Sequence, residues 1–335
     1  MAVSMHDVAR HAGVSQRTVS NVVNNSVHVA PETRARVEAS LLELGYRPNV
    51  AARRLRSGRT GTITLAIPGF AERYFADLAE AVIAEARGIG TDVLVETTGG
   101  QHDRELAILD GRHGLLTDGV IMSAITIGSA DDSVSRAPYP LVLVGDHEFE
   151  GPVDHVGIPN RKAARAAVAH LFQAGRDRVA LVGALGQPSD SASLRRQGYA
   201  AALRDAGRSA DDAIMIECAW SHEGGHDAVA QLLALPHPPD GVFAMNDALA
   251  LGLLDAYQRR GIRVPDDVAV IGFDNTLEAR QSLPTLTSID PSLDVIARTA
   301  LTMLREQFES QGHRAPQHRH VPFRLQIRES TAARN

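Results

Sequence analysis

The 335-residue chain contains very little cysteine and no long apolar segment. Its one cysteine, Cys218, excludes an internal disulfide framework and a cysteine-rich metal cluster. The N-terminus is polar, and no run approaches the roughly 18 apolar residues of a membrane-spanning helix. We therefore expect a cytoplasmic protein with no membrane partner. The hydrophobic content of 44% is still sufficient for a sizeable core.

Lysine is also scarce, since Lys162 is the only one, and arginine carries almost all of the positive charge. Residues 1–60 hold nine arginines against four acidic residues, a net charge of +5. The rest of the chain holds 25 basic and 36 acidic residues, a net charge of −11. This distribution predicts that contact with a polyanion such as DNA is confined to the N-terminal end.

The N-terminal segment contains two helix-forming patterns joined by a glycine turn. Ser4 and Asp7 have the spacing of a capping box, and Gly13 can end the first helix in the left-handed conformation. In the second helix, Val19 and Val23 are expected to point inward. Two short helices joined in this way are typical of the helix-turn-helix motif.

The outward face of the second helix would carry side chains that suit base edges. Arg17 can bond guanine bidentately, and Gln16 or Asn21 can do the same to adenine. The side chains expected to bond phosphates are Thr18, Ser20, Asn24 and Asn25. The alternative is a small three-helix bundle whose polar face is only solvated.

A third helix and a short basic segment follow. Pro31 suits a first helical position, and the spacing of Val37, Leu41 and Leu44 predicts a helix. Residues 49–55 are rich in alanine and arginine, and a helix of this length is marginal in water. We expect it to form only when DNA organises it.

Residues 4–59 resemble the DNA-binding headpiece of the LacI/GalR (lac repressor) family of bacterial transcription regulators. The family motif D-V-A-x-x-A-G-V-S-x-x-T-V-S-x-V-V-N stands at 7–24, and the hinge form Y-x-P-N-x-x-A-x-x-L stands at 46–55. The resemblance places Gln16, Arg17 and Asn21 at base-reading positions. The hinge residues that it assigns to DNA contact are Asn49, Ala52 and Leu55, with Leu55 as an apolar wedge in the minor groove.

Two departures from the family pattern affect these expectations. Many members have arginine where Asn21 stands, which changes the preferred bases. Ala30 replaces the usual serine or threonine cap before Pro31, which should weaken the start of the third helix by about 1 kcal/mol.

From residue 62 the pattern changes to short apolar runs that alternate with longer helical stretches. The strand candidates are 62–67, 92–96, 119–122, 141–144, 178–182, 241–245 and 268–273. The helical stretches between them include 75–87, 161–174, 192–206, 224–234 and 247–260. Continuous apolar strands that alternate with helices predict α/β architecture with parallel sheets covered on both faces, and this number of units exceeds one sheet.

The body resembles the two-lobed periplasmic-binding-protein-like core of the same family. We therefore expect a headpiece at 1–46, a hinge and linker at 47–61, and a core at 62–335. The N-lobe would comprise about 62–159 and 291–320, and the C-lobe about 161–289 and 322–331. The resemblance places the crossings between lobes near 158–162, 289–292 and 319–322.

In open α/β sheets, ligands bind beyond the carboxyl ends of the strands. That rule selects Asp146 after the fourth strand, and the resemblance assigns an effector pocket to Tyr74, Arg195, Trp220, Asn246 and Asp274. Charged and amide groups beside aromatic faces suit a polyhydroxylated ring. The alternatives are that Asn246 or Asp247 caps the next helix, that Asp274 only forms a turn, and that Tyr74 belongs to the core.

Patterns that suggest catalysis are weak. Residues 222–226 match H-E-x-x-H, a zinc-protease motif, but Gly224 and Gly225 cost about 2 kcal/mol of helix propensity. His313, His318 and His320 form only a loose cluster. We expect no catalytic residue, no metal and no cofactor.

These observations predict a homodimeric repressor that binds a near-palindromic operator in double-stranded DNA and responds to a small-molecule effector. A sugar or sugar derivative is the first candidate, and a purine-responsive, corepressor-dependent regulator is an alternative. A solute-binding protein would share the two-lobed body but would need a signal peptide and would lack residues 4–56. An enzyme would need a nucleophile–base pair or a set of metal ligands.

Overall fold

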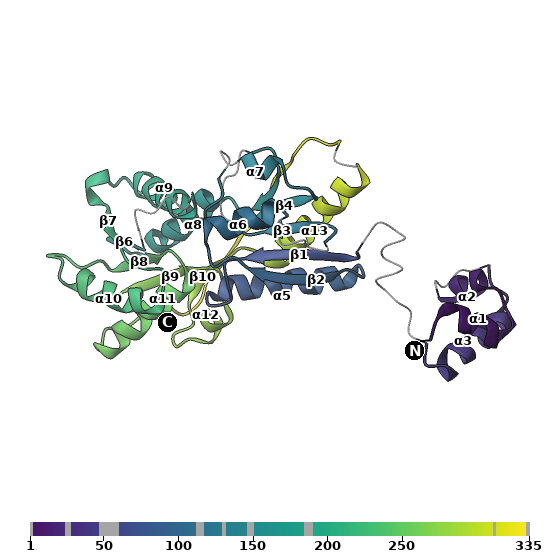
Figure 1. Cartoon of the computed structure of the whole chain (residues 1–335). Helices are drawn as coiled ribbons and strands as arrows, with labels where there is room; N and C mark the ends of the chain where they lie inside the picture. Colours follow the sequence, from purple (N-terminus) through teal and green to yellow (C-terminus); the bar gives the residue numbers. More distant parts are fainter. Residues whose placement is uncertain are drawn as a thin grey trace. The chain divides into compact units, whose positions relative to one another are not determined.

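The computed structural model describes residues 3–23, 28–46, 60–111, 117–128, 132–145, 151–183, 190–310 and 313–332. The chain divides into two compact units, Met1–Thr60 and Gly61–Asn335 (Figure 1). Six predicted site residues lie outside the described residues: Asn24, Asn25, Asn49, Ala52, Leu55 and Asp146.

Within the described residues of the first unit, three helices are present: α1 (Met5–Ala12), α2 (Gln16–Val23) and α3 (Pro31–Glu43). The capping box at the start of α1 is present. The Asp7 amide donates to Ser4 Oγ at 3.3 Å, and the Ser4 amide donates to Asp7 Oδ2 at 3.0 Å. Gly13 follows α1 with φ of 64°, which a residue without a Cβ adopts at little cost. No side chain caps α3, as Ala30 led us to expect.

The core of this unit corrects one expectation. Val8, Val19 and Val37 are fully buried, and the second buried valine of α2 is Val22 rather than Val23. Positions three and four residues apart lie on the same side of a helix, so the spacing alone does not choose between them. Packing against α1 and α3 selects Val22, and Val23 is only partly buried beside the same cluster.

Two six-stranded sheets form the second unit. The first has the order β11-β5-β4-β3-β1-β2, from β1 (Thr62–Ile67), β2 (Asp92–Thr97), β3 (Val120–Met122), β4 (Leu141–Val144), β5 (Asp154–Gly157) and β11 (His318–His320). The second has the order β12-β10-β9-β8-β6-β7, from β6 (Val179–Val182), β7 (Ile214–Ile216), β8 (Gly241–Ala244), β9 (Ala269–Phe273), β10 (Thr287–Asp290) and β12 (Arg324–Gln326). All strand pairs are parallel except β10 with β12.

Helices cover both faces of each sheet (Figure 1). The helices beside the first sheet are α5 (Arg73–Gly88), α6 (His102–Leu109), α7 (Asp132–Ser135) and α13 (Leu293–Glu309). Those beside the second are α8 (Asn160–Gln173), α9 (Asp190–Asp205), α10 (His222–Leu233), α11 (Asp247–Arg259) and α12 (Leu277–Gln281), with a 3₁₀ turn at Ala210–Asp212. Strands β1, β3, β4, β6, β8 and β9 are buried along their whole length. The predicted fold, helix-turn-helix helices plus a two-sheet α/β core, is confirmed.

The chain passes between the two sheets three times: between β5 and α8, between β10 and α13, and between β11 and β12. Five short strands escaped the sequence analysis: β5, β10, β11 and β12, which contain polar residues, and β7, which is apolar but only three residues long. Helix α13 was missed as well, although its apolar residues recur at helical spacing. In the part of the chain that the structure describes, no helix is both long and apolar enough to cross a membrane.

Candidate functional site

Helix α2 presents a polar surface opposite its two buried valines. Gln16 and Arg17 are exposed, whereas Ser20 and Asn21 are half-buried. Arg17 makes no ion pair with any residue within the described ranges. Its guanidinium therefore gives up no internal partner when it meets a base or a phosphate. The Arg17 side chain is therefore available for contact with an external group.

The hydroxyl of Thr18 is already used within the helix start. Its Oγ1 lies 2.8 Å from Ser15 Oγ, and Ser15 Oγ accepts the Thr18 amide at 3.1 Å. Ser15 thus caps α2, which fixes the direction in which the helix leaves the turn. Thr18 contributes to that cap, and a phosphate contact would share the same hydroxyl.

A second set of predicted residues gathers at the carboxyl ends of the strands of the second sheet. We call this set the strand-end cluster; it consists of Arg195, Trp220, Asn246 and Asp274. Arg195 of α9 is 1% exposed, and its Nε donates to Asn160 Oδ1 at 3.0 Å. Its Cζ lies 3.5 Å from the centre of the Phe273 ring and 5.3 Å from that of Trp220. The guanidinium is therefore held between two aromatic rings and an amide, which fixes its orientation.

Trp220 and Asn246 are tied to the same strand ends. Trp220 Nε1 donates to the Gly183 carbonyl at 2.7 Å, and Asn246 Nδ2 donates to the Trp220 carbonyl at 3.2 Å. Asn246 Oδ1 accepts the Leu249 amide at 2.9 Å, so the expected alternative, a cap of α11, is correct for this side chain. A ligand contact would come in addition to that cap.

Asp274 directly follows Phe273 at the end of β9, and its amide donates to the Ile289 carbonyl at 2.8 Å. Its φ of 114° lies in a region that residues with a Cβ rarely adopt. A simple turn at this position would be served better by glycine. A carboxylate in a glycine-like conformation therefore points to a use for the side chain.

Tyr74 belongs to the other sheet. It is half-buried at the start of α5, beside the carboxyl end of β1, and its ring meets that of Phe75 edge to face at 5.2 Å. Arg73, its neighbour in α5, forms an exposed ion pair at 3.9 Å with Glu278 of α12, which belongs to the second sheet. The carboxyl ends of the two sheets are therefore close enough at this point for side chains to meet.

The sequence analysis did not assign Phe273 or Asn160 to the strand-end cluster, and it considered Asp247 only as a possible cap of α11. Phe273 stacks on Arg195, Asn160 accepts from Arg195, and the fully buried Asp247 accepts the amide of Thr276, two residues after Asp274. Phe273 could have been found, because it is the aromatic residue that ends the strand immediately before Asp274. The other two act through contacts between distant segments, which no local pattern shows.

Burial raises the pKa of Asp247 to about 7. Hydrogen bonds from Ser288 and Thr276, and the charge of Arg328, act in the opposite direction. Both carboxyl oxygens have partners in the interior of the second sheet. Because both of its oxygens are already used by internal donors, we do not expect Asp247 to contact a ligand itself.

The H-E-x-x-H segment is helical, in agreement with the predicted helical stretch at 224–234, despite the low helix propensity of its two glycines. A Cβ on Gly224 would lie 2.2 Å from the Ala219 carbonyl oxygen, and one on Gly225 would lie 2.1 Å from that of Leu249. Tertiary packing overrides the low helix propensity, because only glycine allows α10 to approach α11 so closely. The part of the chain that the structure describes contains no group of three or more His, Cys, Asp or Glu residues that could hold a metal.

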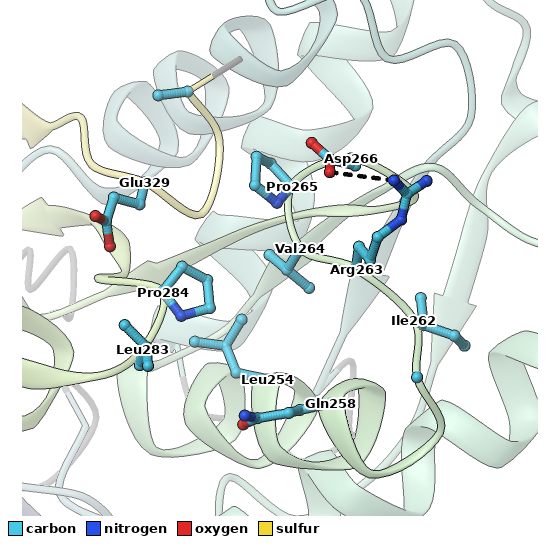
Figure 2. Close-up of a pocket in the computed structure, with 12 residues that line it drawn as sticks. Leu254, Gln258, Ile262, Arg263, Val264, Pro265, Asp266, Leu283, Pro284 and Glu329 are labelled. Carbon is cyan, nitrogen blue, oxygen red and sulfur yellow. Dashed lines mark ion pairs between the residues drawn. The ribbon is translucent and has the colours of Figure 1, made fainter. Parts of the chain in front are cut away.

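A cavity of about 490 Å³ lies at the opposite end of the second sheet, beside the residues that precede β9 and β10 (Figure 2). Its wall includes Leu254, Val264, Leu283 and Pro284. The charge on Arg263 is satisfied, since its guanidinium pairs with Asp266 and Asp267. The cavity lies at the other end of the sheet from the strand-end cluster and shares no lining residue with it.

The chain matches two known families along its length. Residues 4–49 match "Bacterial regulatory proteins, lacI family", and residues 168–331 match "Periplasmic binding protein-like domain". Catabolite control protein A of Priestia megaterium is 33% identical over 333 residues, which cover 99% of this chain and all of that protein.

Two solved structures extend the comparison. The lac repressor dimer bound to operator and the anti-inducer ONPF matches with a TM-score of 0.84 at 27% identity, covering 99% of this chain and 100% of that one. A complex of the transcriptional regulator CelR with cellobiose matches with a TM-score of 0.70 at 29% identity, covering 98% of this chain and 99% of that one.

Proposed function

Because the chain belongs to the lacI family of bacterial regulatory proteins, we propose that it is a repressor that binds a near-palindromic operator as a homodimer and is controlled by a sugar-like effector. Family membership confirms the predicted resemblance and makes the chain a transcriptional regulator rather than an enzyme. The operator, the dimer and the effector class are the parts that we propose.

The exposed polar face of α2 carries the proposal for DNA. Gln16, Arg17 and Asn21 would read base edges in the major groove, and Thr18, Ser20 and Asn24 would contact phosphates. A homodimer presents two copies of α2 to the two half-sites of a palindrome. The related lac repressor was solved as a dimer on its operator. From the family resemblance we also propose that Asn49, Ala52 and Leu55 contact the minor groove.

The DNA proposal is tested by selecting operator sequences from a random duplex library with the full chain. Arg17→Ala should cost about 1–3 kcal/mol of binding and relax the preference at one operator position. Arg36→Ala is the matched control, since it removes an exposed arginine from α3. It should weaken binding to all duplexes equally and leave the selected sequence intact. An unchanged preference in the Arg17 variant would refute the base-reading assignment.

The strand-end cluster supports the proposed effector site. Arg195, Asn246 and Asp274 would supply hydrogen bonds, and Trp220 would supply an apolar face for a ring. Tyr74 and Asp146 would contribute from the first sheet. The CelR relative was solved with cellobiose, which fits a sugar as first candidate. The aromatic faces also suit a purine, so both classes must be tested.

Trp220 is the only tryptophan in the chain, so its fluorescence reports directly on this cluster. We would titrate the protein with cellobiose, ribose, lactose, adenine and guanine. A saturable change with a sugar that is lost in Asp274→Ala supports the proposal. A change with a purine alone would replace the sugar class by the purine class. A response that persists undiminished in Asp274→Ala would exclude Asp274 from the site.

A further inference from the structure

The turn that presents Asp274 has an unusual backbone. Asp274 and Asn275 follow one another with φ values of 114° and 54°. Two consecutive left-handed residues with side chains persist only where the surrounding structure holds them. The contacts of the next amides show which group does so.

The backbone amides of Asn275 and Thr276 are both linked by hydrogen bonds to the carboxyl group of Asp247. The Asn275 amide donates to Ser288 Oγ at 3.0 Å, and the Ser288 hydroxyl donates to Asp247 Oδ1 at 2.6 Å. The Thr276 amide donates to Asp247 Oδ2 at 2.8 Å, and the Thr276 hydroxyl donates to the same oxygen at 3.2 Å. Asp247 thus holds the turn directly at one residue and through a single hydroxyl at the other.

The fold makes room for this carboxyl group. Asp247 is the first residue of α11 and is fully buried. A Cβ on Gly272 would lie 2.3 Å from Asp247 Oδ1, so β9 requires a glycine at the point where the carboxyl group packs. Arg328, from the segment after β12, bonds Asn275 Oδ1 and closes the other side of the turn. Three segments distant in sequence therefore converge on residues 274–276.

We infer that Asp247 is a positioning residue of the effector site, whose carboxyl group holds residues 274–276 so that Asp274 can bind the effector. The inference rests on the proposed role of Asp274 and extends it to a residue that does not touch the ligand. Without this support, Asp274 would adopt its strained backbone conformation only on binding. The free energy needed to reach that conformation would then weaken the affinity for the effector. Asp247 keeps the turn organised before the effector arrives.

Ser288→Ala is the sharpest perturbation, because it removes only the bridging hydroxyl. Ser330→Ala is the matched control. Ser330 is also a fully buried serine of the second sheet region, its hydroxyl donates to the Val270 carbonyl at 2.6 Å, and it accepts the Thr287 amide. Both variants lose buried hydrogen bonds, so both should unfold at a lower temperature. Only Ser288→Ala should disturb the turn.

The first measurement is amide hydrogen exchange by NMR on the full chain without effector. In Ser288→Ala the Asn275 and Thr276 amides should exchange at least tenfold faster, relative to the interior of α11, than in the wild type. Ser330→Ala should leave that ratio unchanged. Asp247→Asn, which replaces one acceptor oxygen with a donor, should have a larger effect if it folds. Equal ratios in the two serine variants would overturn the inference.

The second measurement is the affinity for whichever of cellobiose, ribose, lactose, adenine and guanine changes the fluorescence of Trp220. Ser288→Ala should raise its Kd about tenfold, and Ser330→Ala less than twofold. A change in Kd no larger in Ser288→Ala than in Ser330→Ala would overturn the inference. If none of the five compounds binds the wild type, the proposed effector classes fail, and the exchange experiment still decides the role of Asp247.

Discussion

Replacing Asp274 by glycine should stabilise the core and abolish the effector response at the same time. The φ of 114° at this position costs a residue with a Cβ about 1–3 kcal/mol. Glycine avoids that cost, although its greater freedom in the unfolded chain offsets about 0.4–1 kcal/mol. The net gain from the backbone is therefore about 1 kcal/mol.

Comparison with Asp274→Ala isolates the backbone contribution to stability, because alanine removes the same carboxylate but keeps the Cβ. The glycine variant should be more stable than the alanine variant by about 1 kcal/mol, or about 2–4 °C in Tm for a domain of this size. Both variants should lose the change in Trp220 fluorescence on titration with a sugar. Urea and thermal unfolding of the two proteins, measured side by side, provide the comparison.

Asp227 provides a control position at which the order of stability of the alanine and glycine variants should be reversed. It is exposed in the interior of α10, where helical backbone is open to any residue. There, alanine should be more stable than glycine by about 1 kcal/mol. If glycine at 274 proves equal to or less stable than alanine, the backbone at Asp274 is not strained. The argument that its carboxylate is retained for ligand binding would then be wrong.

Three further predictions concern packing and protonation. Gly225→Ala should destabilise the core by about 1–3 kcal/mol in urea unfolding, because its Cβ would lie 2.1 Å from the Leu249 carbonyl oxygen. Gly88→Ala is the control and should not destabilise the core, because a Cβ there has no atom within 4 Å. Burial raises the pKa of the Cys218 thiol to about 11, so the rate of its reaction with a disulfide reagent should rise about tenfold per pH unit. At pH 8 the reaction should stay slow until urea unfolds the protein. A fast reaction of the folded protein would contradict this. Burial raises the pKa of Asp247 to about 7 in the folded state, so its contribution to stability is full at pH values below the unfolded pKa and is lost as pH rises through 7. Asp247→Asn should remove this dependence of the free energy of unfolding on pH. An identical dependence in both proteins would exclude Asp247 as its source.

The helix-turn-helix segment was predictable because its signals are local. A capping box, a glycine turn and apolar residues at helical spacing act within one or two turns of chain, and the three helices formed where those signals lay. The central strands were predictable for a similar reason, since each is an unbroken apolar run that must be buried on both faces. The choice between Val22 and Val23 was not local, because it depends on the positions of α1 and α3.

Strand ends could be located from sequence, and with them Asn246 and Asp274, because the polar residue after each apolar run marks the edge of the sheet. Their surroundings could not be located. Asp247 meets Ser288 forty-one positions later along the chain, and Arg195 meets Phe273 across an even longer separation. The glycines of α10 looked unfavourable for a helix until the neighbouring carbonyl oxygens were in place. Short-range propensities are written into each segment of the chain, whereas the partners of a buried polar group and the space left for a Cβ exist only once distant segments have packed together.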